Sequence, residues 1–159
     1  MRISYLMASV ALAAIIAFSL PIVTVQAQQR GSTDETITFF YYEDVAVAAP
    51  FYDDLLGFEK TMDQVWVKIY RITPTSSVGL VQQGHGFHDV SEDKPAMLSI
   101  VTKNIDAWYE FLVEADVVIR KELPDYQTSL KPTDAPVRGF VVEDPGGYTV
   151  EFFSWRNLE

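Results

Sequence analysis

The order of secondary structure predicted for this chain occurs twice, and this repeat restricts the fold more than any other feature of the sequence. A strand pattern at 36–42 leads into a helix pattern that begins after Asp44, and a strand pattern at 96–102 leads into one that begins after Asn104. The first helix contains Phe-Tyr-x-x-Leu, and the second contains Trp-Tyr-x-x-Leu at the corresponding place. Further strand patterns follow each helix. The chain is therefore predicted to contain two similar modules.

The two predicted modules occupy residues 36–83 and 96–156, and a polar loop at 84–95 joins them. Residues 28–35 form a polar lead-in. Strands outnumber helices, and each module has one helix that can cover one face of a sheet. These features predict an α+β fold, in which helices lie on one side of a curved mixed sheet.

Residues 1–27 have the features of a secretory signal peptide. Arg2 precedes an uncharged, largely apolar run, and Val25-Gln26-Ala27 places small residues where a signal peptidase cleaves. Cleavage after Ala27 predicts a secreted or periplasmic protein that has no membrane association afterwards. The alternative is an uncleaved N-terminal anchor, since the apolar run is nearly long enough to span a bilayer.

The charge and the cysteine content exclude several classes of partner and chemistry. The whole chain has a formal net charge of -10, and the part from residue 28 onward has -11, because Arg2 is lost and no acidic residue is. So acidic a domain repels phosphate backbones and anionic membranes, so nucleic acid is not expected as a partner. The chain has no cysteine, which excludes disulfides, thiolate ligands and a cysteine nucleophile.

Three segments carry a resemblance to a known family. They are "YYEDVAVAAPFYDDLLGFE" (41–59), "MLSIVTKNIDAWYEFLVEADV" (97–117) and "VVEDPGGYTVEFF" (141–153). Together they resemble the glyoxalase/bleomycin resistance protein/dioxygenase superfamily, which has the vicinal oxygen chelate (VOC) fold. The resemblance implies two βαβββ modules whose sheets surround a cavity, and it covers about 36–156.

The same resemblance implies where metal ligands would lie, because the family's metal enzymes take one ligand from the first and the fourth strand of each module. These positions fall at Ile37, Gly79, Met97 and Glu151. Glu151 alone offers a hard donor, and a divalent cation needs several oxygen or nitrogen ligands. The resemblance therefore predicts the fold and argues against the family's usual metal chemistry, so no cofactor is predicted.

Strand alternation predicts an aromatic cavity with two charged members. Glu151 is expected to point into the cavity, while its neighbours Val150 and Phe152 face the helices. In the "WVKIY" strand, Val67 and Ile69 suit the helix side. The ligand-binding residues are then predicted to be Tyr41, Trp66, Lys68, Tyr70 and Glu151.

Two interpretations of Glu151 remain open. In the first, apolar walls raise its pKa, and it acts as a catalytic acid or base or as a hydrogen-bond acceptor while Lys68 and Tyr70 hold a polar or anionic ligand. In the second, Glu151 and Lys68 pair with each other, or both reach solvent. Arg138 is a further basic residue whose facing the pattern does not decide.

The two histidines, His85 and His88, lie in the loop "GHGFHDV". With Asp89 they form a weak candidate for a surface metal site, or they could join Glu151 over the cavity. A solvated loop is the more economical interpretation of the same residues.

The first hypothesis for function is an exported, metal-independent protein whose cavity binds a small aromatic or amphipathic molecule. The alternative is a lyase, isomerase or dioxygenase of the superfamily that holds a divalent metal with Glu151 and His85 or His88. A third hypothesis is an interaction module with an occluded cavity. Whether the protein is an enzyme stays open, and so does the choice between a monomer and a homodimer with exchanged modules.

Overall fold

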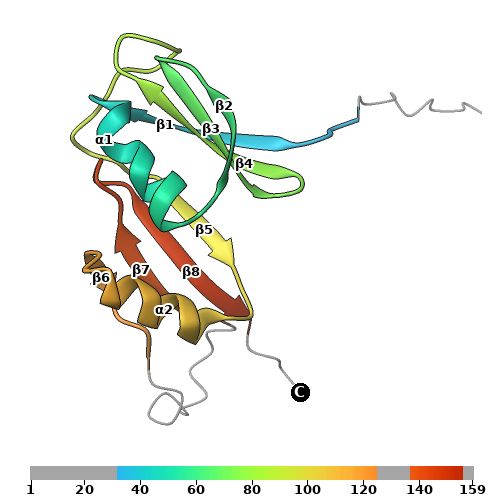
Figure 1. Cartoon of the computed structure of the whole chain (residues 1–159), viewed down its shortest axis with the longest axis vertical. Coiled ribbons are helices and arrows are strands. Elements are labelled where there is room, and N and C mark those ends of the chain that lie inside the picture. Colours follow the sequence, from blue (N-terminus) through green and yellow to red (C-terminus); the bar gives the residue numbers. More distant parts are fainter. Residues whose placement is uncertain (1–31, 125–136, 156–159) are drawn as a thin grey trace, which may run out of the picture. The chain divides into compact units, whose positions relative to one another are not determined.

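A computed structural model of the chain describes residues 32–124 and 137–155, and the compact unit that holds both modules begins at Thr33 (Figure 1). The predicted signal peptide and residues 28–31 of the polar lead-in lie outside this described part. Within it, no helix has the length and apolar character that a membrane span requires.

The first module has the predicted order of strand, helix and strands. Its sheet has the strand order β1-β4-β3-β2, in which β1 runs parallel to β4 and the other neighbours are antiparallel. The strand β2 has no counterpart in the sequence prediction. The elements are β1 (Thr36–Tyr42), α1 (Val45–Pro50), the π-helical turn η1 (Phe51–Leu55), β2 (Glu59–Asp63), β3 (Val67–Thr73) and β4 (Ser76–Gln82).

The second module repeats this topology. Its strand order is β5-β8-β7-β6, with β5 parallel to β8, so the α+β fold of two βαβββ modules is confirmed. Each module forms a four-stranded sheet of its own, with its helix beside it (Figure 1). The elements are β5 (Met97–Val101), α2 (Ile105–Glu114), β6 (Ile119–Lys121), β7 (Val137–Glu143) and β8 (Thr149–Trp155).

The ends of the first helical segment follow from its sequence. The Asp44 side chain accepts a hydrogen bond from the backbone N–H of Ala46, as an N-cap should. Pro50 ends α1, and the chain continues as a π-helical turn, because proline has no N–H to donate within an α-helix. Gly57 follows with a φ of 67°, which glycine adopts without strain. Asn104, in contrast, makes no side-chain cap hydrogen bond to α2.

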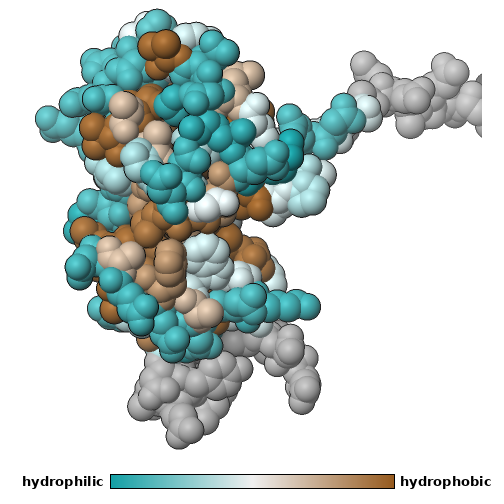
Figure 2. Space-filling model, in the orientation of Figure 1, coloured by the Kyte–Doolittle hydropathy of each residue, from teal (hydrophilic) through white to brown (hydrophobic). Residues whose placement is uncertain are grey.

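One continuous core lies between the sheets and the helices. It contains Phe40, Val78 and Leu80 from the first sheet and Val150 and Phe152 from the second. Apolar surface nevertheless remains exposed in places between the hydrophilic side chains (Figure 2). Alternation along the strands thus produces a covered face on each sheet, and it leaves an opposite face that the helices do not cover.

A buried carboxylate at the start of the β7–β8 turn ties the two modules together. Asp144 is 3% exposed, and its Oδ2 accepts hydrogen bonds from the hydroxyls of Tyr42 (2.6 Å) and Tyr52 (2.8 Å) of the first module. Its Oδ1 accepts from the backbone N–H groups of Gly146 (2.9 Å) and Tyr148 (2.8 Å). With four donors, the carboxylate is satisfied without water, which a buried acidic group requires.

Replacing Asp144 with Ala should lower the free energy of unfolding by about 3–5 kcal/mol, because four buried donors lose their acceptor. Urea unfolding followed by circular dichroism measures this loss. Asp93→Ala, in the exposed 84–95 loop, is the control and should change stability by less than about 0.5 kcal/mol. An Asp144→Ala protein as stable as the control would contradict the role given to this carboxylate.

The tyrosines predict how stability depends on alkaline pH. Burial raises the pKa of both Tyr42 and Tyr52 above the usual value near 10, and Asp144 adds to the increase. Above about pH 10, the unfolded chain therefore loses these protons while the folded chain keeps them, so stability falls as pH rises. The slope should be about 1.4 kcal/mol per pH unit for each tyrosine. Urea unfolding from pH 9 to about 11.5 should show that the stability of Tyr42→Phe falls less steeply with pH than that of the unchanged protein. The difference in slope should be about 1.4 kcal/mol per pH unit, the contribution of one tyrosine. An unchanged slope would contradict the assignment.

Candidate functional site

The candidate site is the pair of sheet faces that point away from the helices, called here the open faces. On β1 and β4, Phe40, Val78 and Leu80 belong to the main core, so Phe39 and Gly79, which alternate with them, lie on the open face of the first module. On β8, Val150 and Phe152 belong to the core, so Glu151 lies on the open face of the second module. The facing predicted for Glu151 is thus the observed one.

The open face of the first module is largely closed by its own side chains. Val67, Ile69 and Val81 form a small buried cluster there, against which Ile37 and Tyr41 pack. Two of these five residues come from β3, one from β4 and two from β1.

The histidine loop folds onto the edge of this face. His88 meets the Tyr41 ring edge-on at 5.5 Å between ring centroids, and His85 stacks on Trp66 at 5.9 Å. The Phe87 side chain, in contrast, is 90% exposed. Tyr41 and Trp66 are therefore each in aromatic contact with one histidine of this loop.

Phe39 occupies the place above Gly79. A Cβ atom at residue 79 would lie 2.5 Å from two carbons of the Phe39 ring, closer than van der Waals contact permits. Phe39 is also the direct neighbour of Gly79 in the β1–β4 register. A carboxylate-bearing side chain at residue 79 thus has no room unless the aromatic ring moves.

Glu151 lies on the open face of the second module, where several of the neighbouring side chains are exposed. Its Oε2 accepts a hydrogen bond of 2.8 Å from the hydroxyl of Ser99, its direct neighbour on β5. The side chains that share this face are largely apolar and partly exposed. They are Met97 (47% exposed), Val101 (55%), Phe153 and Trp155 (60%).

The facing predicted for β3 is wrong. Tyr70 is fully buried in the main core and stacks on Tyr52 of η1, so Tyr70 and Lys68 lie on the helix-covered side, whereas Val67 and Ile69 lie on the open side. Apolar character could not decide the facing, because both sides of β3 are buried. Lys68 and Tyr70 therefore do not share a face with Glu151.

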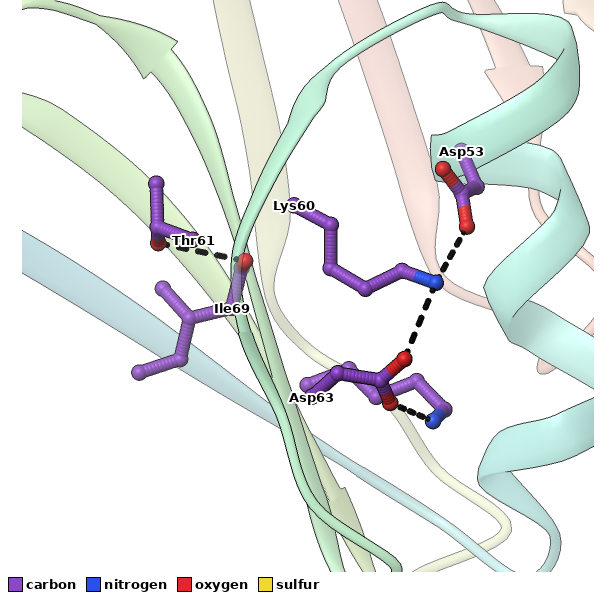
Figure 3. Close-up of polar contacts among 6 residues, drawn as sticks. Asp53, Lys60, Thr61, Asp63 and Ile69 are labelled. Carbon is purple, nitrogen blue, oxygen red and sulfur yellow. Dashed lines mark hydrogen bonds and ion pairs between the residues drawn. The ribbon is translucent and has the colours of Figure 1, made fainter.

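Lys68 has a different partner from the one considered in the sequence. It forms an ion pair with Asp63, its cross-strand neighbour on β2, and this pair lowers the pKa of Asp63. Lys60 joins the same Asp63 to Asp53 of η1, at 3.3 and 2.6 Å (Figure 3). The pairing of Glu151 with Lys68 is thereby excluded.

Tyr70 and Arg138 also belong to structural contacts. Burial raises the pKa of Tyr70 to about 12, and its hydroxyl has no hydrogen-bond partner in the described part of the chain. The buried Arg138 guanidinium donates to the Asp106 carboxylate at 2.7 Å and to the Pro124 carbonyl at 2.9 Å. Arg138 is thus committed to a contact between β7 and α2.

The donors present do not fit a divalent metal ion. Within residues 32–124 and 137–155, no group of three or more His, Cys, Asp or Glu side chains lies close enough to hold one. Of the family's ligand positions, Ile37 and Met97 offer no hard donor, and the Phe39 ring fills the space at Gly79. The histidines contact aromatic rings instead.

Sequence reasoning missed three residues of this arrangement: Phe39 above Gly79, Ser99 beside Glu151, and Asp144 behind the turn. The repeat contained a signal for two of them. Phe39 lies five residues before Asp44, and Ser99 lies five residues before Asn104, so the two residues are equivalent in the repeat. Each is the direct neighbour of the fourth-strand position of its module, which is Gly79 in the first and Glu151 in the second.

This topology defines a two-module α+β protein with open sheet faces, and comparisons with known proteins agree. The sequence model described as "Glyoxalase/Bleomycin resistance protein/Dioxygenase superfamily" matches residues 36–152. The chain belongs to this superfamily. A search of curated protein sequences finds no match.

Solved structures of low sequence identity share the fold. A glyoxalase/bleomycin resistance protein/dioxygenase from Nocardioides is 17% identical with a TM-score of 0.63, covering 84% of this chain and 89% of its own. A lactoylglutathione lyase from Agrobacterium tumefaciens is 12% identical with a TM-score of 0.59, covering 79% and 96%. TioX from Micromonospora sp. ML1 is 17% identical with a TM-score of 0.58, covering 79% and 100%. At these identities, the likeness concerns the fold alone.

Gly79→Ala should lower the free energy of unfolding by about 1–3 kcal/mol, because the added methyl group collides with the Phe39 ring. In a Phe39→Ala background, the same substitution should cost nothing or stabilise slightly, since alanine loses less backbone entropy than glycine on folding. Urea unfolding of the four proteins in this cycle measures the coupling. Equal costs in both backgrounds would show that Phe39 does not occupy this space.

Proposed function

We propose that this protein binds a small aromatic or amphipathic molecule on its open faces, without a metal ion. The observation that supports this most directly is the Phe39 ring over Gly79, where an aromatic side chain stands in place of a carboxylate. The same surface that lacks metal donors offers apolar side chains and one hydrogen-bonding carboxylate. Such a combination suits an organic ligand, which is held by apolar contact and oriented by a few polar groups.

The charge of the surface restricts the ligand further. Glu151 is an acceptor of hydrogen bonds, and Lys68, the expected partner for an anion, lies on the opposite side of its sheet. The net charge of the protein is strongly negative. The ligand is therefore an aromatic molecule that carries a hydrogen-bond donor or a positive charge, and Glu151 is the group that receives it.

A second copy of the chain would complete the site. Within the described residues, β1 and β5 are edge strands of their sheets, with one side of the backbone unpaired. Phe39 (45% exposed), Met97 and Val101 lie on these two strands. An exposed edge with large apolar side chains is a surface that proteins usually cover. The proposed assembly is a homodimer in which the first module of one copy pairs with the second module of the other.

The location that we propose is outside the cytoplasm. This part of the proposal depends on the sequence of residues 1–27 alone, with cleavage after Ala27.

A titration with two aromatic dyes tests the proposed ligand class. Crystal violet is cationic, and 1-anilinonaphthalene-8-sulfonate is anionic, and both quench tryptophan fluorescence when bound nearby. The protein should bind crystal violet saturably and more tightly than the anionic dye. Glu151→Gln should weaken crystal violet binding by about tenfold, the equivalent of 1.4 kcal/mol, and should change the anionic dye less.

Two matched variants serve as controls. Glu110→Gln removes an exposed carboxylate on α2, and Lys68→Ala removes a cation on the helix-covered side, so neither should change dye binding. Sedimentation velocity of the same samples should show a dimer. The proposal fails if no dye binds saturably or if Glu151→Gln behaves like Glu110→Gln, and the assembly fails if the protein sediments as a monomer.

A further inference from the structure

A pocket of about 440 Å³ lies away from the open faces, between the start of α1, the loop after β4 and the β7–β8 turn. Neither the repeat nor the superfamily motif pointed to it. Its size falls within the range of small-molecule sites, roughly 300–1,000 Å³. Tyr42 and Gly146, which belong to the contacts around Asp144, form part of its wall, so the best-buried polar network of the protein holds the pocket in shape.

One side of the pocket carries a fixed cation. The Lys94 ammonium donates a hydrogen bond of 2.6 Å to the Ser91 carbonyl and lies 5.0 Å from the centroid of the Tyr148 ring. The aliphatic stem of Lys94 passes over Gly147. In the part of the chain that the structure describes, no carboxylate lies within ion-pair distance of Lys94, so at least one of its donors is available.

Three acidic residues, Glu43, Asp44 and Glu92, belong to the lining of the same pocket, and none of them forms an ion pair with Lys94. Glu43 is held at the start of α1 through its backbone carbonyl, which accepts from the Gln82 side chain, while its own carboxylate makes no ion pair among the described residues. Glu92 likewise has an unpaired carboxylate in this part of the chain. Opposite charges thus line one pocket and stay apart. Val47, Val90 and Pro145 contribute apolar groups to the same lining.

We propose that this pocket binds a small zwitterion with an apolar body, such as an apolar α-amino acid. Lys94 receives the carboxylate of the ligand, Glu43 and Glu92 receive its ammonium group, and the apolar side chains contact its body. A ligand with both charges can pair with charged groups that have no ion-pair partner among the described residues. A simple anion would instead be repelled by the acidic residues of the lining. This site is separate from the open faces, and it does not depend on the function proposed for them.

The test uses three compounds of matched shape, added to the isotope-labelled protein and followed through the backbone amide signals of Ser91, Gly146 and Gly147. L-Leucine carries both charges, 4-methylpentanoate lacks the ammonium group, and 3-methylbutylamine lacks the carboxylate. L-Leucine should shift these signals saturably, with a Kd at least tenfold lower than that of either partial analogue. Lys94→Met, which keeps the apolar stem, should weaken L-leucine binding at least tenfold, while Lys94→Arg should retain most of it.

Lys103→Ala removes an exposed lysine elsewhere and should leave L-leucine binding unchanged. Glu43→Gln together with Glu92→Gln should reduce the advantage of L-leucine over 4-methylpentanoate. The proposal is overturned if L-leucine causes no saturable shift, if the partial analogues bind equally well, or if Lys94→Met binds L-leucine as the unchanged protein does. Because the dye titration monitors the open faces, either proposal can fail without the other.

Discussion

The Asp144 carboxylate is the interaction on which the arrangement of the two modules depends. It accepts hydrogen bonds from the hydroxyls of Tyr42 and Tyr52 in the first module and from two backbone N–H groups of the turn in the second module. A single buried group therefore joins the two modules. Gly146 permits this, because a side chain there would collide with the Tyr42 ring. Tyr148, two residues further on, stacks on Phe40 at 4.1 Å and exchanges hydrogen bonds with the backbone of Tyr41. The turn is therefore a connection between modules as well as the entry to β8.

The same turn and strand carry the residue that first suggested a metal site. Glu151 lies on β8, but its surroundings are not those of a chelate: its neighbour is the Ser99 hydroxyl, and the equivalent position in the other module is a glycine beneath an aromatic ring. The scaffold of the superfamily thus persists with a different surface on its open faces. The function proposed for these faces follows from this difference, because affinity for a hard cation needs several oxygen or nitrogen ligands at once.

The sequence predicted most of the fold and only part of the site, and particular strands show why. The facing of Glu151 on β8 was predictable, because it lies between the apolar core residues Val150 and Phe152. On β1 hydrophobicity does not decide the facing, because Ile37 and Phe39, which alternate with the core residue Phe40, are equally apolar. The facing of β3 was not predictable either, because Val67 and Tyr70 are buried on opposite sides and hydrophobicity does not distinguish them. The strand β2 was missed, because its residues are mostly exposed and lack a strand pattern. The hydrogen bonds of Asp144 join residues that are distant in the sequence, and the position of the Phe39 ring depends on packing against Gly79. Secondary-structure propensity carries no information about either kind of contact.

The measurement that tests the account most directly is the metal content and metal affinity of the purified protein. Equilibrium dialysis against zinc, nickel, manganese and iron(II), followed by mass spectrometry of the metals, compares the unchanged protein with Glu151→Ala. The account predicts less than a tenth of an equivalent of each metal at micromolar concentrations, with no difference between the two proteins. One equivalent of a metal that is retained by the unchanged protein and lost on Glu151→Ala would contradict it.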